Sequence, residues 1–268
     1  MTLRPLILAA WLASAALPAL AAGNTEPDRL ARWDELSGLI FGDDVEIVPT
    51  ETVVTLEAPV RALDAAFVPV RVSTAPDAAV TGLTVVVDDN PGPVAASVRF
   101  GPAGDPRDLG LRVRVDGYTN IHAVATLADG SAVANAAFVK AAGGCSAPIT
   151  TSDAEALADM GEIRLKFGGD SPSEGSARAT LMIRHPNFNG MQMNQVSMLV
   201  TPPRFVSEVE IRRGADLVLA IESDISLSSD PVIDFLYRQG SGAPFTVTVV
   251  DTEGGRWTQD FAAPEVTN

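Results

Sequence analysis

Two long blocks of short segments with alternating apolar and polar residues constrain the fold of this chain more than any other feature. In LRVRVD (111–116) the leucine and valines alternate with two arginines, so one face of the segment is apolar and the other polar, as in a half-buried strand. Turn residues such as Asp129-Gly130 separate these segments. The strands expected in the first block are 52–58, 67–74, 79–89, 94–100, 111–116, 120–129 and 132–140. Seven short strands with regular turns predict an immunoglobulin-like β-sandwich.

The second block repeats this pattern and predicts a second β-sandwich. Its expected strands are 161–167, 177–185, 195–200, 204–213, 215–223, 231–239, 244–251 and 256–262. Ahead of the first block, EPDRLARWDELSGLIFG (26–42) places Leu30, Trp33 and Ile40 at helical spacing. The sequence therefore predicts an all-β chain of two immunoglobulin-like β-sandwich domains, with a short N-terminal helix and a flexible linker between the domains.

The N-terminus has the pattern of a secretory signal peptide. Arg4 is followed by an apolar run and by Ala19-Leu20-Ala21, a small-residue cleavage site. We therefore expect residues 1–22 to be a cleaved signal peptide and the protein to be periplasmic. Without Arg4 the chain has 18 basic and 34 acidic residues, a charge that disfavours nucleic acid and anionic membranes as partners.

The break between the blocks contains the only cysteine of the chain, in KAAGGCSAP (140–148). Glycine is conformationally permissive and has no side chain to pack, so we expect Cys145 to be exposed on a flexible segment. Ser152 and Glu155 have the spacing of a capping box, which predicts a short helix near the end of this linker. The expected divisions are a first domain at 23–140, a linker at 141–160 and a second domain at 161–268.

Several stretches resemble the SoxY and SoxZ subunits of the Sox sulfur-compound carrier. The resemblance to SoxY rests on FVPVRVSTAP (67–76), VVVDDNPGPVAASVRFGP (85–102), LRVRVDGYTNIHAVATLADG (111–130) and VKAAGGCSAP (139–148). The resemblance to SoxZ rests on MIRHPNFNGMQMNQ (182–195) and the DLVLAIESDISLSSDPVIDFLYRQGSGAPFTVTVVDTEGG run (216–255). Together they cover nearly all of the chain after the signal peptide and imply a fused SoxYZ-like carrier, of the kind associated with quinoprotein dehydrogenases.

The resemblance also implies a role for the cysteine. In the Sox system the cysteine of a terminal GGCGG arm bears covalent sulfur intermediates, which implies that Cys145 is the attachment site and that Gly143 and Gly144 make the arm flexible. Ser146 and Ala147 replace the following glycines, and the arm leads into a second domain instead of ending the chain. The implied partners are periplasmic sulfur-oxidising enzymes or a quinoprotein dehydrogenase system, and two fused halves suggest a monomer.

A catalytic site and a metal site fit the sequence less well than a carrier does. A cysteine enzyme needs a base beside its thiol, and nothing in the sequence places His122 or His185 next to Cys145; we expect them in a sheet and in a turn. Met191 and Met193 near His185 form a weak Cu(I) pattern, but methionines that fill an interface are the favoured interpretation. We therefore expect no enzymatic turnover, no cofactor and no metal.

Three classes of function follow from these observations. The favoured class is a covalent sulfur carrier that uses Cys145. The alternative is a β-sandwich adaptor for a periplasmic quinoprotein dehydrogenase, in which the thiol is not used. A thiol redox protein is disfavoured because no second cysteine is present to resolve a mixed disulfide.

Overall fold

The computed structural model describes residues 24–170, 174–240 and 242–264. It begins with helix α1 (Glu26–Phe41), where Pro27 lies in the first turn and Gly42 follows the last. The backbone N–H of Thr25 donates to Asp28 Oδ2 at 2.9 Å, which satisfies one of the groups left open at a helix start. The predicted N-terminal helix is therefore confirmed. The proposed signal peptide lies outside the described residues.

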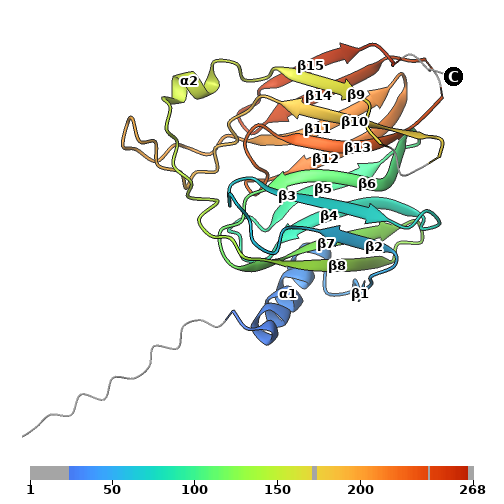
Figure 1. The fold of residues 1–268 in the computed structure, drawn as a ribbon, viewed down its shortest axis with the longest axis horizontal. Helices are drawn as coiled ribbons and strands as arrows, with labels where there is room; N and C mark the ends of the chain where they lie inside the picture. The colour runs from blue at the N-terminus through green and yellow to red at the C-terminus, as the bar shows by residue number, and fades with distance from the viewer. Residues whose placement is uncertain (1–23, 171–173, 241, 265–268) are drawn as a thin grey trace, which may run out of the picture.

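Fifteen strands follow among the described residues (Figure 1). The first half holds β1 (Ile47–Pro49), β2 (Val54–Glu57), β3 (Val68–Thr74), β4 (Val80–Val87), β5 (Val94–Phe100), β6 (Gly104–Val113), β7 (Thr119–Leu127) and β8 (Ala132–Val139). The second half holds helix α2 (Asp153–Leu157) and then β9 (Ile163–Phe167), β10 (Ser176–Ile183), β11 (Val206–Arg213), β12 (Asp216–Ser223), β13 (Val232–Arg238), β14 (Phe245–Asp251) and β15 (Arg256–Phe261). The all-β class of the chain is confirmed.

The two halves share their sheets. One sheet has the order β1-β8-β7-β4-β5-β12-β11-β14-β15 and the other β2-β3-β6-β13-β10-β9. The halves join edge to edge, through antiparallel pairing of β5 with β12 and of β6 with β13. Each half thereby covers edge strands that would otherwise present unpaired backbone groups, and Figure 1 shows one continuous double-layered body.

The alternation that predicts the strands also builds the core. Along β6, Leu109, Leu111 and Val113 are buried while Arg112 is exposed. On the partner strand β13, Phe235 is fully buried and belongs to the same hydrophobic cluster. One core thus runs through both halves, so neither half buries its apolar face independently of the other.

Three sequence expectations about strands are wrong. The strand expected at 111–116 is the end of β6, which begins at Gly104 and ends at Val113. Residues 195–200 were expected as a strand but form a turn and part of a projecting loop, because Asn194 Oδ1 accepts from the backbone N–H groups of Val196 and Ser197 and closes a turn there. Strand β1 was not expected, because its three residues show no usable alternation; it pairs in parallel with β8. Among the described residues no helix is long and apolar enough to cross a membrane.

Candidate functional site: the cysteine arm between the two halves

The linker between β8 and β9 runs along one side of the molecule, from the first half to the second (Figure 1). Its later part forms α2, and the predicted capping box is present: the Ser152 N–H donates to Glu155 Oε2 at 2.9 Å, and the Glu155 N–H donates to Ser152 Oγ at 3.3 Å. We call residues 140–151 the cysteine arm. Its backbone is hydrogen-bonded to both halves.

The start of the arm is attached to the first half. The backbone N–H of Lys140 donates to the Val60 carbonyl at 2.9 Å. Further along, the Gly143 N–H donates to the Asp116 carbonyl at 2.9 Å and the Gly144 N–H to the Val115 carbonyl at 3.0 Å. These bonds continue the backbone pairing of the sandwich beyond the end of β8.

Cys145 itself is buried, with 1% of its surface exposed. Its N–H donates to Asp116 Oδ1 at 3.3 Å, and its carbonyl accepts from Asn189 Nδ2 at 2.7 Å. The expectation of an exposed cysteine is therefore wrong for this conformation. The physical reason is that Asp116 from one half and Asn189 from the other satisfy the backbone polar groups of the cysteine and allow it to be buried.

The two glycines before the cysteine have different structural requirements. Gly143 has a φ of +77°, a conformation that strongly favours glycine. At Gly144 the requirement is space, because a Cβ there would lie 2.1 Å from the Ala65 carbonyl oxygen and 2.7 Å from that of Val115. In this conformation both glycines allow the arm to dock, while the role in arm flexibility assigned to them from the sequence stays a prediction.

The second part of the arm runs beside a loop between β10 and β11. Gln192 Nε2 donates to the Ala147 carbonyl at 3.2 Å, and Asn194 Nδ2 donates to the Thr151 carbonyl at 3.0 Å. Between them, Ile149 bonds to this loop through its backbone: its N–H donates to the Met193 carbonyl at 3.1 Å and its carbonyl accepts from the Gln195 N–H at 2.9 Å. The loop and the arm thus form a short two-stranded pairing.

Comparison with protein families assigns both halves. A model described as sulfur oxidation protein SoxY matches residues 39–145, and one described as sulphur oxidation protein SoxZ matches residues 168–262. The chain is a SoxY–SoxZ fusion. The SoxY match ends at Cys145, and the segment between the matches holds the rest of the arm and α2.

Solved structures give weaker similarities. The SoxY sulfur carrier protein of Chlorobium limicola f thiosulfatophilum is 25% identical, covers 42% of this chain and 94% of its own, and has a TM-score of 0.36. A superoxide reductase (neelaredoxin) of Ignicoccus hospitalis is 15% identical over 33% of this chain and 79% of its own, with a TM-score of 0.30. A β-glycosidase of Bacteroides vulgatus is 11% identical over 80% of this chain and 25% of its own, with a TM-score of 0.25. Comparison with curated proteins gave no match.

The thiol of Cys145 lies in an environment that disfavours its charged form. Burial, and to a lesser extent the nearby carboxylate of Asp116, raise the pKa of the Cys145 thiol to about 11, although the guanidinium of Arg114 acts in the opposite direction. Since the thiolate is the reactive form, the docked thiol is protected from reagents both by its burial and by its protonation.

Arg114 connects the SoxY and SoxZ halves beneath the arm. Its Nη1 donates to the Ile225 and Leu227 carbonyls at 3.0 and 2.7 Å, and its Nη2 to the Asn187 carbonyl at 2.8 Å. Burial lowers the pKa of Arg114 to about 10, so the guanidinium is still charged at neutral pH. Among the described residues its Nε has no hydrogen-bond partner.

A cavity of about 260 Å³ lies beside the arm, between the two halves. Arg114 forms part of its wall, together with Phe67, Pro148, Ile149 and Phe188. Polar and charged side chains, including the Arg184–Asp230 ion pair, complete the lining. The arm therefore borders a space of mixed polarity that includes the buried positive charge of Arg114. Neither Arg114 nor Asn189 was singled out from the sequence, because each is far from Cys145 along the chain and only strand pairing between the halves brings them together.

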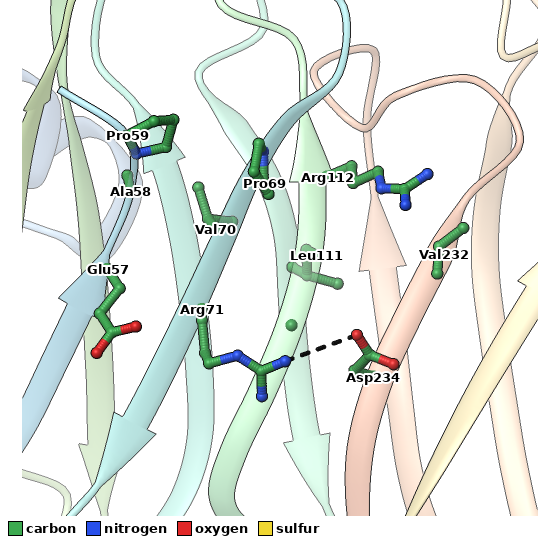
Figure 2. A pocket seen from close by; sticks show the side chains of 11 residues that line it. Glu57, Ala58, Pro59, Pro69, Val70, Arg71, Leu111, Arg112, Val232 and Asp234 are labelled. Carbon is green, nitrogen blue, oxygen red and sulfur yellow. Dashed lines mark ion pairs between the residues drawn. The ribbon is translucent and has the colours of Figure 1, made fainter. Parts of the chain in front are cut away.

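A larger open groove of about 500 Å³ crosses the outer face of the six-stranded sheet at the junction of the halves (Figure 2). Arg71 of the SoxY half lies 3.8 Å from Asp234 of the SoxZ half and also pairs with Asp108. The groove is lined by no residue of the cysteine arm. Because the groove does not border the arm, we assign it no role in the chemistry of the thiol.

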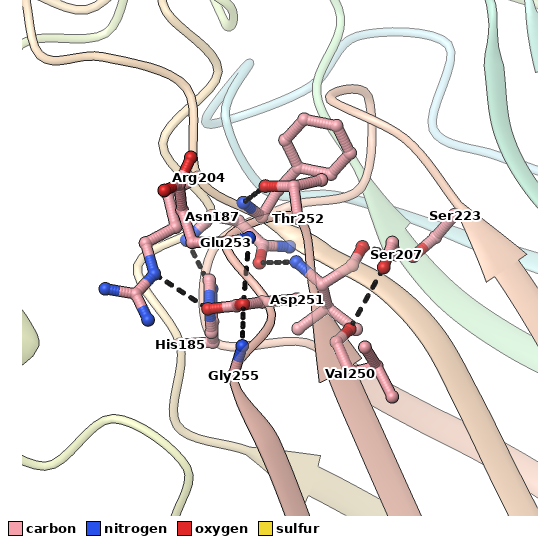
Figure 3. A network of polar contacts seen from close by, with 12 residues as sticks. His185, Asn187, Arg204, Ser207, Ser223, Val250, Asp251, Thr252, Glu253 and Gly255 are labelled. Atoms are coloured by element: carbon pink, nitrogen blue, oxygen red, sulfur yellow. Dashed lines mark hydrogen bonds and ion pairs between the residues drawn. The ribbon is translucent and has the colours of Figure 1, made fainter.

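The two histidines are engaged elsewhere. His122 Nδ1 lies 2.9 Å from Asp88 Oδ1, and its ring stacks on Trp33 of α1 with centroids 3.7 Å apart. His185 is fully buried in a polar network with Asp251 (Figure 3). The expectation that His122 packs in the sheet agrees with this geometry, and His185 follows β10, as expected for a turn position.

No site for a metal ion emerges from the described residues: no group of three or more His, Cys, Asp or Glu side chains there could hold one. The two methionines near His185 in the sequence differ in exposure. Met191 is half-buried, and Met193 has 48% of its surface exposed, so Met193 fills no interface within the chain. The expectation that it fills an interface stays a prediction. The bond that its carbonyl accepts from Ile149 orients its backbone, while the side chain stays in solvent.

Proposed function

We propose that this SoxYZ fusion is a periplasmic carrier that binds an intermediate of sulfur oxidation covalently on Cys145 and presents it to partner enzymes. One observation carries the proposal: the match to SoxY ends at the only cysteine of the chain, directly after Gly143 and Gly144. This is the position at which the sequence resemblance implies attachment of the cargo. The periplasmic setting rests on the signal-peptide pattern of residues 1–22.

The carrier alternates between the docked arm and a presented arm in this proposal. Presentation of Cys145 breaks the four hydrogen bonds that hold Gly143, Gly144 and Cys145. At about 0.5–1.5 kcal/mol for each bond, this cost is within what the binding of a partner protein supplies. The glycines then serve two states: they permit close docking, and they let the backbone turn freely after release.

Loading of the carrier forms a sulfur–sulfur bond. When the Cys145 thiolate joins an equally reduced sulfur anion, the thiol proton goes to solvent or a base and two electrons leave the pair of sulfur atoms. A partner that accepts two electrons is therefore required, in keeping with the expected sulfur-oxidising enzymes or quinoprotein dehydrogenase system. Of the charged groups that line the cavity beside the arm, Arg184 and Asp230 pair with each other. The remaining positive charge of Arg114 suits an anionic cargo.

The experiment is the intact mass of the protein purified from its native source, before and after reduction, with Cys145→Ser as the control. A reducible adduct that maps to Cys145 supports the carrier and identifies its cargo. A bare thiol under both sulfur-oxidising and alcohol-oxidising growth contradicts the carrier.

The adaptor is the second candidate, and the burial of the thiol favours it. A cysteine with a pKa raised to about 11 is a poor nucleophile at neutral pH, as expected of a thiol that is not used. Under the adaptor function, Cys145→Ser leaves the growth phenotype of the host unchanged. Under the carrier function, the same substitution abolishes sulfur oxidation that depends on this protein.

A further inference from the structure

The loop between β10 and β11 exposes an unusual amount of apolar surface. We call residues 189–201 the methionine loop. Its tip carries five of the exposed large apolar side chains of the described residues, namely Met193, Val196, Met198, Leu199 and Val200. Val196 and Leu199 are 64% and 68% exposed. Contiguous exposed apolar surface of this kind marks interaction sites in soluble proteins.

The methionine loop is held in its shape by its own hydrogen bonds. The Thr201 N–H donates to the Gln192 carbonyl at 3.0 Å, and the Asn194 N–H to the Leu199 carbonyl at 2.9 Å. Asn194 Oδ1 in turn accepts from the Val196 N–H at 2.8 Å. The backbone groups of the tip are thus satisfied inside the loop, and the apolar side chains are presented to solvent.

The loop and the arm differ from the rest of the protein in that they are poor in charged residues. The chain has a net charge of −15, yet residues 187–203 and 141–152 contain no Asp, Glu, Lys or Arg. The methionine loop and the part of the cysteine arm after Lys140 therefore contribute only uncharged side chains to the surface of an acidic protein. A partner that contacts this surface needs an uncharged, apolar contact area, because unpaired charges there would be desolvated without compensation.

The methionine loop lies beside the cysteine arm, which indicates what kind of partner contacts it. Three side chains of the loop donate to backbone carbonyls of the arm: Asn189 to Cys145, Gln192 to Ala147 and Asn194 to Thr151. Two backbone hydrogen bonds with Ile149 add to them. Any enzyme that reacts with the cargo on Cys145 has to approach within bonding distance of the arm. Such an enzyme meets the methionine loop as it arrives.

We propose that the methionine loop is the docking surface for the enzyme that loads or unloads Cys145, and that this enzyme has an uncharged apolar rim at the entrance to its active site. The proposal rests on the proposed carrier function. Flexible methionine side chains adapt to different contact surfaces, which suits a carrier that visits more than one enzyme. Because the loop also holds the arm, its movement on docking weakens the bonds that keep Cys145 buried.

Site-specific photocrosslinking in the native host tests this docking. A benzophenone amino acid replaces Leu199 in one full-length variant, Ser146 of the arm in a second, and Leu39 of α1, which is 77% exposed, in a third. The Ser146 variant identifies the enzyme that reaches the arm. We expect the Leu199 variant to capture that same enzyme and the Leu39 variant not to capture it.

Each other outcome overturns the proposal. A cross-link from Leu199 to a second copy of this chain makes the loop a homodimer interface. If the Ser146 variant captures an enzyme and the Leu199 variant does not, the loop is not part of the docking surface. The mass of Cys145 is measured on the same samples. Loaded Cys145 with no cross-link at either position refutes the docking surface alone, whereas unloaded Cys145 under all conditions refutes the carrier function.

A second measurement uses the enzyme captured at Ser146. Val196→Ser combined with Leu199→Ser is expected to weaken its affinity for the carrier by about tenfold or more, as the loss of central apolar contacts does in other interfaces. Leu39→Ser is the matched control and leaves the affinity unchanged. Both altered residues of the loop are largely exposed, so an unchanged melting temperature establishes that the variant is folded; an unchanged affinity in that folded variant overturns the proposal.

Discussion

Gly144 lies so close to Ala65 that a Cβ added at residue 144 would fall 2.1 Å from the Ala65 carbonyl oxygen. That oxygen is already the acceptor for the Val115 N–H at 2.8 Å, so it belongs to the backbone framework of the SoxY half and has little freedom to move. The contact means that a glycine before the cysteine is a requirement of the docked arm. It also distinguishes a docked arm from an arm that is simply flexible.

We expect Gly144→Ala to make Cys145 more reactive. The new methyl group cannot be accommodated against the backbone of Ala65, so the arm leaves its docked position and exposes the thiol. The rate of alkylation by iodoacetamide at pH 8 should rise by about tenfold or more, since each 1.4 kcal/mol of lost docking energy is a factor of ten in the equilibrium.

The control for this prediction is Gly117→Ala, because a Cβ at Gly117 meets no atom within 4 Å. Its alkylation rate should equal that of the unaltered protein. If Gly144 only supplies flexibility, Gly144→Ala will leave the rate unchanged or lower it, and that result contradicts the docked arm.

Asn189→Ala should also release the arm, from the SoxZ side. The substitution removes the donor that lies 2.7 Å from the Cys145 carbonyl and leaves a buried acceptor without its partner, a cost of about 1–3 kcal/mol. We expect faster alkylation of Cys145, by about five- to a hundredfold. Ser146→Ala is the comparison, because its hydroxyl makes only an exposed contact of 3.4 Å with the Gly143 carbonyl; if both variants react equally fast, Asn189 does not hold the arm.

The pH dependence of alkylation reports the environment of the thiol. Burial raises the pKa of Cys145 to about 11, so at pH 7 the docked thiolate is on the order of one part in ten thousand of the thiol. Since the pKa of the docked thiol lies above that of a free thiol, the contribution of the neutral thiol to docking is complete below pH 8.5 and is lost as the pH rises toward 11. The rate should therefore keep rising above pH 9.

The profile of Gly144→Ala provides the comparison. Its released thiol should behave as an ordinary cysteine, with a rate that levels off above pH 8.5. Coincident profiles for the two proteins would mean that the thiol of the unaltered protein is already solvated, in conflict with its burial.

The sequence predicts this fold well because most of the information is local. The alternation of Leu111, Arg112 and Val113 depends only on which face of β6 meets the core. The capping box of Ser152 and Glu155 is local in the same sense. The prediction of a strand at 195–200 failed because a short run of apolar residues at an exposed loop tip has the same pattern as a buried strand.

The environment of Cys145 is the part that local pattern does not reveal. Glycines next to a cysteine predict a free arm, yet Asp116 is 29 residues away and Asn189 is 44 residues away along the chain. They meet at the arm because β6 pairs with β13 across the two halves. That pairing of edge strands decides whether the thiol is buried. The sequence pattern of each half, taken alone, does not show how the two halves pair.

The network around His185 makes the stability of the SoxZ half sensitive to acid (Figure 3). His185 Nδ1 accepts from the Asn187 N–H at 3.1 Å, so the neutral ring carries its proton on Nε2, which lies 3.5 Å from Asp251 Oδ2. Asp251 also accepts from Arg204 Nε at 2.7 Å and from the Gly255 N–H at 2.6 Å. Its negative charge is therefore already balanced by neighbours other than His185.

Burial lowers the pKa of His185, while its contact with Asp251 opposes this effect only in part. The folded protein therefore prefers the neutral ring, so this contribution to stability is complete above pH 6.5 and is lost as the pH falls through 6.5 toward the lower folded pKa. We expect the melting temperature to decrease from pH 8 to pH 5, by about 2–4 °C for each kcal/mol lost. In His185→Gln, which has no titrating ring, the decrease should be smaller. Because all other groups are shared, the difference between the two melting curves isolates His185, and a difference that does not change between pH 8 and pH 5 contradicts a buried neutral ring.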